Sequence, residues 1–256
     1  MKHLYLIVSF LISFHFSVVA QEIPVTEIGA LSQVYGNTVK SEDSQSFNDL
    51  GIEFGYALYA TEIEVKTDKP ILDLENVRDY ASVYLNNDLQ GIVTDNNKCL
   101  VLDAPAGKYT LRLYVENIGR ITYGPEILDN LKGIFGKITL DNESIQNWSM
   151  VPLNVRQCDV RNLHFDERKP NQLPSFYKGY FNLATVKDYY LNISGWGMGE
   201  VWVNGSYIGS YWDEEKQQSI NMPAENLING KNEIVIFELK NDSQKVLKLS
   251  DTPVFK

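Results

Sequence analysis

The sequence predicts an all-β protein made of two antiparallel β-sandwiches, and three observations support this fold class. Apolar and polar residues alternate with a period of two along most of the chain, which is the pattern of half-buried strands. Turn-forming pairs separate these short runs, and no segment has the period of a long helix. Short strands joined by frequent turns are typical of sandwiches or barrels rather than of alternating strand–helix units.

The first sandwich is predicted over residues 46–156. Alternating apolar residues predict strands near 71–75, 109–116 and 134–140, and Asp141-Asn142 follows the last of these as a turn. A domain of this size can bury a core of its own.

The second sandwich is predicted over residues 174–240. Asn204-Gly205 lies between two apolar runs, 201–203 and 207–209, and this dipeptide is a strong signal for a tight hairpin. Four consecutive apolar residues at 234–237 predict a strand that is buried on both faces.

Three segments are expected to lie outside the sandwiches. Residues 157–173 are polar and of mixed charge, which predicts a linker between the domains. Residues 21–45 are weakly patterned and are expected to form a strap across the surface. Residues 241–256 are similar and are expected to form a C-terminal tail.

The first 20 residues have the pattern of a secretory signal peptide. Lys2 and His3 precede an apolar run that ends in small residues, with cleavage expected after Ala20. The run is shorter and more polar than the roughly 20 apolar residues of a membrane span. We therefore expect a secreted or periplasmic protein.

Composition argues against several classes of partner. The chain has 33 acidic and 23 basic residues, a net charge of −10. An acidic chain is not attracted to phosphate backbones or anionic lipids, so neither nucleic acid nor a membrane is an expected partner. No glycine-rich phosphate loop precedes a helix, and we expect no cofactor.

Histidine and cysteine are scarce in the expected mature chain. His164 is the only histidine after Ala20, and it is expected to be an exposed side chain of the linker, so a Ser–His–Asp or Cys–His site would depend on it alone. Cys99 and Cys158 lack the paired spacing of a zinc site, and no metal site is expected. Their spacing leaves open whether they form a disulfide.

Carboxylate pairs are the remaining route to hydrolytic chemistry, because glycoside hydrolysis needs an acid and a second carboxyl group across one bond. Glu116 and Glu238 are of interest because each follows an apolar strand run. The alternative for each is a strand-end acid that caps a turn or pairs with an arginine such as Arg120, and nothing places either acid across a cleft from a partner. No catalytic residue is therefore predicted.

Aromatic residues are the main candidates for ligand binding. Trp196, Trp202, Tyr211 and Trp212 fall within one short stretch, and flat rings of this kind can stack on a sugar ring while Asn204 binds hydroxyl groups. The alternative is core packing, where large aromatics bury much area. Trp202 alternates with a valine on each side, so either the tryptophan or the valines should face the core.

Several motifs follow one another in a fixed order along residues 46–239. Among them are 54–63, 77–85, 115–124 (VENIGRITYG), 195–199 (GWGMG) and 201–205 (VWVNG). Together they resemble the jelly-roll, galactose-binding-like domains that follow the catalytic barrel in glycoside hydrolase family 35 β-galactosidases. The loop of the third motif faces the barrel in that family, which adds Asn117, Arg120 and Tyr123 to the candidate ligand contacts.

The resemblance implies a chain without the family's catalytic residues. Both catalytic glutamates of that family lie in an N-terminal (β/α)₈ barrel, and here the expected signal peptide leads almost directly into the region that follows it. The family usually has Arg, Lys and Arg where this sequence has Ala60, Met198 and Ser210. These departures suggest that contacts with a barrel have relaxed.

Three functions remain open at this stage. The chain is expected to be a non-catalytic carbohydrate-binding or accessory module for galactosides or related glycans. Alternatively, it completes a separately encoded β-galactosidase barrel as a subunit. The third possibility is a structural scaffold with no sugar site, which burial of Trp196, Trp202 and Trp212 would favour. A stand-alone glycosidase is the least favoured reading.

Overall fold

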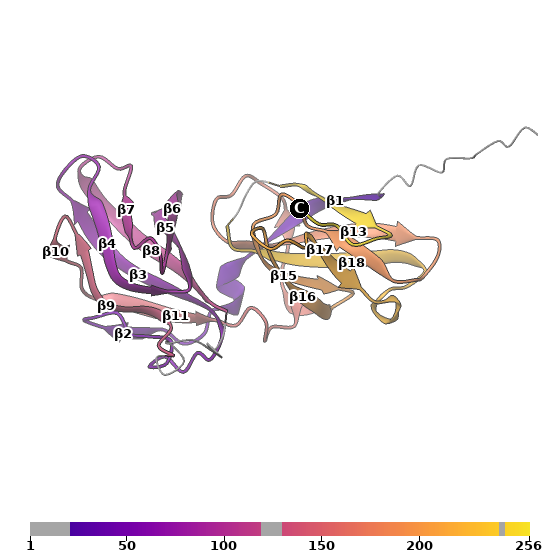
Figure 1. The fold of residues 1–256 in the computed structure, drawn as a ribbon, viewed down its shortest axis with the longest axis horizontal. Coiled ribbons are helices and arrows are strands. Elements are labelled where there is room, and N and C mark those ends of the chain that lie inside the picture. Colours follow the sequence, from indigo (N-terminus) through magenta and orange to yellow (C-terminus); the bar gives the residue numbers. More distant parts are fainter. Residues whose placement is uncertain (1–20, 119–129, 241–243) are drawn as a thin grey trace, which may run out of the picture.

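A computed structural model describes residues 21–118, 130–240 and 244–256. Two β-sandwich lobes lie next to each other, and all named strands pair antiparallel (Figure 1). The predicted all-β class with two sandwich domains is confirmed. Among the described residues, no helix has the length and hydropathy needed to cross a membrane.

The first sandwich contains a four-stranded and a six-stranded sheet. Its strands are β2 (Val39–Ser41), β3 (Gly55–Val65), β4 (Ile71–Arg78), β5 (Tyr80–Leu85), β6 (Asp88–Thr94), β7 (Cys99–Val101), β8 (Gly107–Asn117), β9 (Gly133–Leu140), β10 (Glu143–Ser144) and β11 (Trp148–Leu153). The sheet orders are β10-β9-β4-β7 and β2-β11-β3-β8-β5-β6.

The six-stranded sheet is buried on both faces at the end nearest the second lobe. On β3, Ala57 and Tyr59 point into the core of the first sandwich, whereas Tyr56 and Leu58 point into a separate core. This separate core also contains Phe176, Trp202 and Phe237 of the second lobe, and we call it the junction core. Its buried members are Leu31, Val34, Tyr56, Leu58, Tyr80, Tyr84, Tyr114, Val151, Leu153, Val155, Val160, Phe176, Met198, Trp202, Val235, Phe237 and Leu239.

The second sandwich is built around β1, which joins its two layers. Its strands are β1 (Gln21–Ala30), β12 (Asp166–Glu167), β13 (Ser175–Leu183), β14 (Tyr189–Asn192), β15 (Met198–Val203), β16 (Ser206–Trp212), β17 (Ser219–Met222), β18 (Gly230–Glu238) and β19 (Val246–Ser250). They follow the order β16-β15-β18-β13-β1-β19-β14-β17, with β12 also paired to β1.

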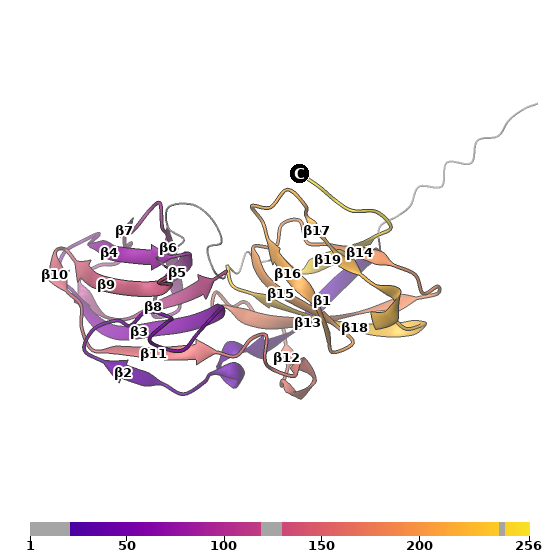
Figure 2. The same ribbon diagram turned by 60° about the horizontal axis from the view of Figure 1, so that its bottom comes forward.

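The predicted strap and tail are corrected by this topology. Residues 21–24 pair with β19, and β1 then continues along β13, with Ile23 and Val25 buried in the second core. Figure 2 shows the indigo β1 within the lobe formed by the C-terminal half. The pairing was not evident from the sequence because β1 contains Pro24 and its main partners, β13 and β19, lie more than 140 residues away.

Local turn chemistry agrees with the sequence at the predicted hairpin. Asn204 and Gly205 have φ values of 50° and 83°, as a type I′ turn requires, and they connect β15 to β16.

The predicted linker contains the short helix η3 (Val160–Asn162), and Val160 is buried in the junction core. His164 is exposed as expected.

The other short helices in the described residues are η1 (Leu31–Val34), which follows β1, and η4 (Ala224–Asn226), which precedes β18.

Both cysteines are free thiols, with Cys99 exposed on β7 and Cys158 half-buried in the linker. The structure therefore answers the question that their spacing left open: they do not form a disulfide.

Candidate functional site

A buried polar network connects the two sandwiches at their junction. Glu200 of β15 is fully buried, and both of its carboxyl oxygens are occupied. Oε1 accepts hydrogen bonds from the Tyr56 hydroxyl at 2.9 Å and from Arg156 Nε at 2.7 Å, and Oε2 accepts one from the Tyr207 hydroxyl at 2.8 Å. The first domain, the segment after it and the second domain each supply one donor, so Glu200 holds them together.

Arg156 also contacts aromatic rings on both sides of the junction. Its guanidinium carbon lies 5.0 Å from the ring centre of Phe54 and 5.5 Å from that of Tyr207. Such cation–π contacts add to the ion pair with Glu200. Arg156 therefore bridges the domains by charge and by packing.

Glu116 lies next to this network at the end of β8 and is only 7% exposed. Burial raises the pKa of its carboxyl group to about 8, and the negative charge of Glu200 adds to the effect. Tyr56 and Arg156 oppose this shift, but they do not cancel it. Glu116 Oε2 is buried, and no described residue is its hydrogen-bond partner, which is uncommon for a buried polar atom.

A cavity of about 370 Å³ opens beside Glu116 at the junction. Trp212, at the end of β16, is half-buried in its wall, and its buried indole Nε1 likewise has no hydrogen-bond partner within residues 21–118, 130–240 and 244–256. The wall contains residues of both domains. They are Glu116, Ile118, Ile193, Met198, Ser210, Tyr211, Trp212, Glu215, Gln217, Ser219 and Ile220.

Two of the positions at which the sequence departs from the family pattern lie in this wall. Met198 and Ser210 both line the cavity, and neither carries the positive charge usual in the family that the sequence resembles. Among the described residues, the wall of this cavity contains the carboxyl groups of Glu116 and Glu215 and no lysine or arginine.

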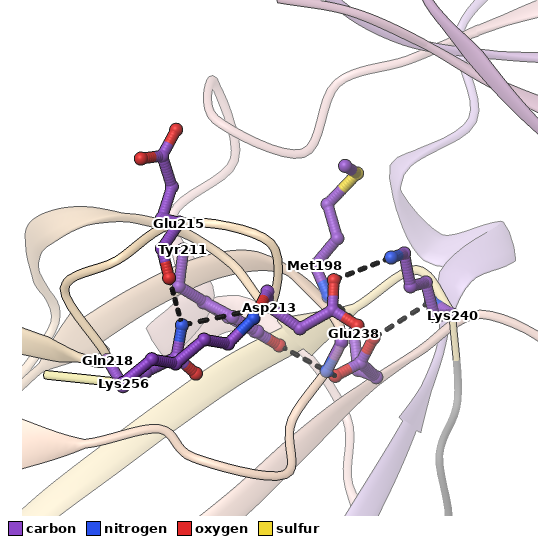
Figure 3. Close-up of polar contacts among 9 residues, drawn as sticks. Met198, Tyr211, Asp213, Glu215, Gln218, Glu238, Lys240 and Lys256 are labelled. Carbon is purple, nitrogen blue, oxygen red and sulfur yellow. Dashed lines mark hydrogen bonds and ion pairs between the residues drawn. The ribbon is translucent and has the colours of Figure 1, made fainter. Parts of the chain in front are cut away.

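Glu238, the other acid singled out in the sequence, has a structural role. Its carboxyl group is buried and accepts hydrogen bonds from the backbone N–H groups of Gly197, Met198 and Lys240 and from the Tyr211 hydroxyl (Figure 3). All of these donors lie at 2.8–3.1 Å. Glu238 is thus the strand-end acid that the alternative interpretation expected.

Contacts around Glu238 also fix the loop that carries Glu215. Lys240 Nζ lies 2.6 Å from the Asp213 carboxylate, and the Gln218 side chain donates a hydrogen bond to the Glu215 carbonyl oxygen. In Figure 3 the Glu215 carboxyl group points away from these contacts. The backbone of this loop is therefore anchored, while the Glu215 side chain is exposed.

Sugar stacking by Trp196 and Trp202 is contradicted by their burial. Trp196 packs against Tyr177 in the second core and donates its indole N–H to the Val246 carbonyl oxygen. Trp202 packs against Phe176 in the junction core, while the valines beside it face the second core. The expectation that only one face of this strand is buried is also wrong, because β15 lies between two cores.

The other predicted ligand contacts are distributed differently. Asn204 uses its side chain within the hairpin region, donating to Asn226 and Asn232. Tyr211 and Trp212 do line the cavity, but the Tyr211 hydroxyl is bonded to Glu238. Asn117 is buried and donates to the Glu53 carbonyl oxygen.

Two predicted contacts cannot be placed, and two important residues were not recognised. Arg120 and Tyr123 lie outside the described residues. Glu200 was missed, although a lone charge within the apolar run 198–203 was a usable signal. Glu116 was singled out from the sequence as an acid that follows an apolar strand run, but not as a candidate ligand contact. In the parts of the chain that the structure describes, no group of three or more His, Cys, Asp and Glu side chains is placed to hold a metal ion.

Two family models match the chain, one for each sandwich. Residues 44–154 match the model described as "Beta-galactosidase, first all-beta domain". Residues 174–232 match the model described as "Beta-galactosidase, galactose-binding domain". Each matched range lies within one lobe, and the second lobe also contains β1, β12 and β19, which lie outside the matched residues.

Curated relatives give the same result. The chain is 28% identical over 229 residues to Beta-galactosidase-1-like protein 2 of Homo sapiens, covering 85% of this chain and 35% of the relative. It is 31% identical over 199 residues to a β-galactosidase of Xanthomonas manihotis, and the match covers 77% of this chain and 33% of the relative. It is 31% identical over 229 residues to the β-galactosidase of Mus musculus, and that match covers 79% of this chain and 35% of the relative. The chain therefore spans about a third of the length of these relatives.

Proposed function

Because the chain belongs to the β-galactosidase family through its two non-catalytic β-sandwich domains, we propose that it is an accessory module that binds carbohydrate. We also propose that it is exported, which the signal-peptide pattern of residues 1–20 supports. The name of the second matched domain, galactose-binding, suggests galactosides as the first ligands to examine.

The observation that carries this proposal is the cavity at the junction. Its volume of about 370 Å³ falls within the range of about 300–1,000 Å³ that is usual for small-molecule sites. Its wall combines apolar side chains such as Ile193 and Ile220 with a few polar ones, among them Gln217 and Ser219. This is the composition expected of a site for a small polar ligand.

Calorimetric titration of the exported chain against a panel of galactosides and plant polysaccharides tests the proposal. We expect saturable binding of at least one glycan, and competition for it by a monosaccharide small enough to enter the cavity. Absence of binding across the panel would overturn the proposal and leave a structural scaffold.

A second candidate function, docking onto a separate catalytic barrel, is favoured by an apolar patch. Phe54, Ile118 and Leu131 are 42%, 63% and 40% exposed, and the first two line a neighbouring pocket together with Lys132 and Arg156. Exposed apolar side chains grouped in this way mark interaction surfaces. Affinity capture from the native host tests this function, and recovery of no glycoside hydrolase would count against it.

A further inference from the structure

We infer that export leaves Gln21 as the first residue of the chain, and that its α-amine and side-chain amide then close into a pyroglutamate ring. This inference goes beyond carbohydrate binding. It rests on the proposed export, because the signal-peptide pattern places the cleavage after Ala20. The site is a modification site on the chain itself and needs no external ligand.

Gln21 lies at the open end of a well-anchored strand. It is the first residue of β1, where it pairs with Leu249 of β19. Gln21 and Glu22 are exposed, whereas Ile23 is fully buried in the second core. The strand is therefore held in place from Ile23 onward, and the two residues before it are open to solvent.

The fold holds the Gln21 side chain only weakly. Among the described residues it makes one hydrogen bond, in which Nε2 donates to the Asn182 carbonyl oxygen at 3.2 Å in an exposed position. Such a bond exchanges with water at little net cost, and the ends of elements fray at low free energy. The side chain can therefore turn back toward its own backbone nitrogen while Ile23 stays buried.

Ring closure is a balanced reaction within one residue. The α-amine nitrogen attacks Cδ of the side-chain amide, so that an N–Cδ bond forms and the Cδ–Nε2 bond breaks. A proton of the amine passes to Nε2, which leaves as ammonia, and nothing is oxidised or reduced. Both reacting groups belong to Gln21 and close a five-membered ring, which gives the reaction the advantage of intramolecular proximity. α-Amino groups titrate at about pH 8, so part of the amine is in the reactive neutral form near neutral pH.

The place of β1 in the sheet gives the modification a consequence. β1 lies between β13 and β19 and supplies Ile23 and Val25 to the second core. An exopeptidase that needs a free amine could remove Gln21 and Glu22, because both are exposed. A pyroglutamate ring has no free amine, so it stops this removal at the first step and β1 keeps its full length.

Mass spectrometry and N-terminal sequencing of the exported chain test the inference. The full chain, residues 1–256, is expressed, recovered after export and held at about pH 8 before it is analysed. Gln21→Asn is the matched control. Its side-chain amide is one methylene shorter, so closure would need a strained four-membered ring and the amine should stay free.

We expect the natural chain to be lighter than residues 21–256 by the mass of one ammonia molecule and to give no N-terminal sequence. Pyroglutamyl aminopeptidase acting on the unfolded chain should remove the block, and sequencing should then start at Glu22. Gln21→Asn should keep its full mass and give a readable sequence from the first cycle. A general aminopeptidase should shorten folded Gln21→Asn by at most two residues and leave the natural chain unchanged.

The outcomes separate this inference from the export on which it rests. A natural chain that begins at Gln21, has its full mass and gives a readable sequence overturns the inference but supports the export. A block that also occurs in Gln21→Asn overturns the inference, because the ring cannot be its cause. A chain that begins at any other residue overturns the cleavage after Ala20, and the inference fails with it.

Discussion

Replacing Glu116 with Gln should remove most of the alkaline instability of this protein. The pKa of the Glu116 carboxyl group is raised from an ordinary 4.5 to about 8 because the group is buried beside Glu200. The folded state therefore favours the neutral form. Its contribution to stability is complete below about pH 4.5 and is lost progressively as the pH rises toward 8.

The expected magnitude follows from this shift. One pKa unit corresponds to about 1.4 kcal/mol, so the full shift corresponds to at most about 5 kcal/mol. Between pH 5.5 and pH 7.5, two units within this window, the free energy of unfolding should fall by about 3 kcal/mol. This is a large part of the roughly 5–15 kcal/mol that stabilises a typical domain.

Urea denaturation at pH 5.5, 6.5 and 7.5 measures the effect. The natural chain should lose stability across this range, and Glu116→Gln, which cannot ionise, should lose much less. Some dependence should remain because burial also raises the pKa of Glu200. The exposed control Glu64→Gln should behave as the natural chain does. Equal pH dependence of the natural chain and Glu116→Gln would refute the burial argument.

Three further predictions concern the junction and the absence of catalysis. Trp202→Ala should lower the free energy of unfolding, measured by chemical denaturation, by about 3–5 kcal/mol, because it leaves a cavity in the junction core next to Phe176. A change of under about 1 kcal/mol would contradict the burial of Trp202 in that core. Arg156→Leu should lower the free energy of unfolding by about 3–5 kcal/mol, because it leaves the buried Glu200 carboxylate without its cation. In the same assay, the double variant Arg156→Leu with Glu200→Gln should recover part of that loss. The purified chain should not turn over a chromogenic β-galactoside; hydrolysis that disappears in Glu116→Gln would identify Glu116 as a catalytic acid instead.

The sequence by itself determined the fold class and much of the local structure. Period-two alternation identifies strands because each half-buried strand presents alternate side chains to its core. The Asn204-Gly205 hairpin was predictable because a type I′ turn needs two residues that tolerate positive φ. The family resemblance depended on such local motifs, and the two matched family domains fall in the same parts of the chain as the motifs.

Only the tertiary structure decided what lies between the sandwiches. The place of β1 depends on strands more than 140 residues away, and no local pattern records such pairing. The burial of Trp202 depends on the first sandwich, which covers the outer face of its sheet. Alternation alone therefore predicted, wrongly, that only one face of this strand is buried. Glu116, Glu200 and Trp212 acquire their environment in the same way. Each is an ordinary strand residue until the packing of two domains excludes water from it.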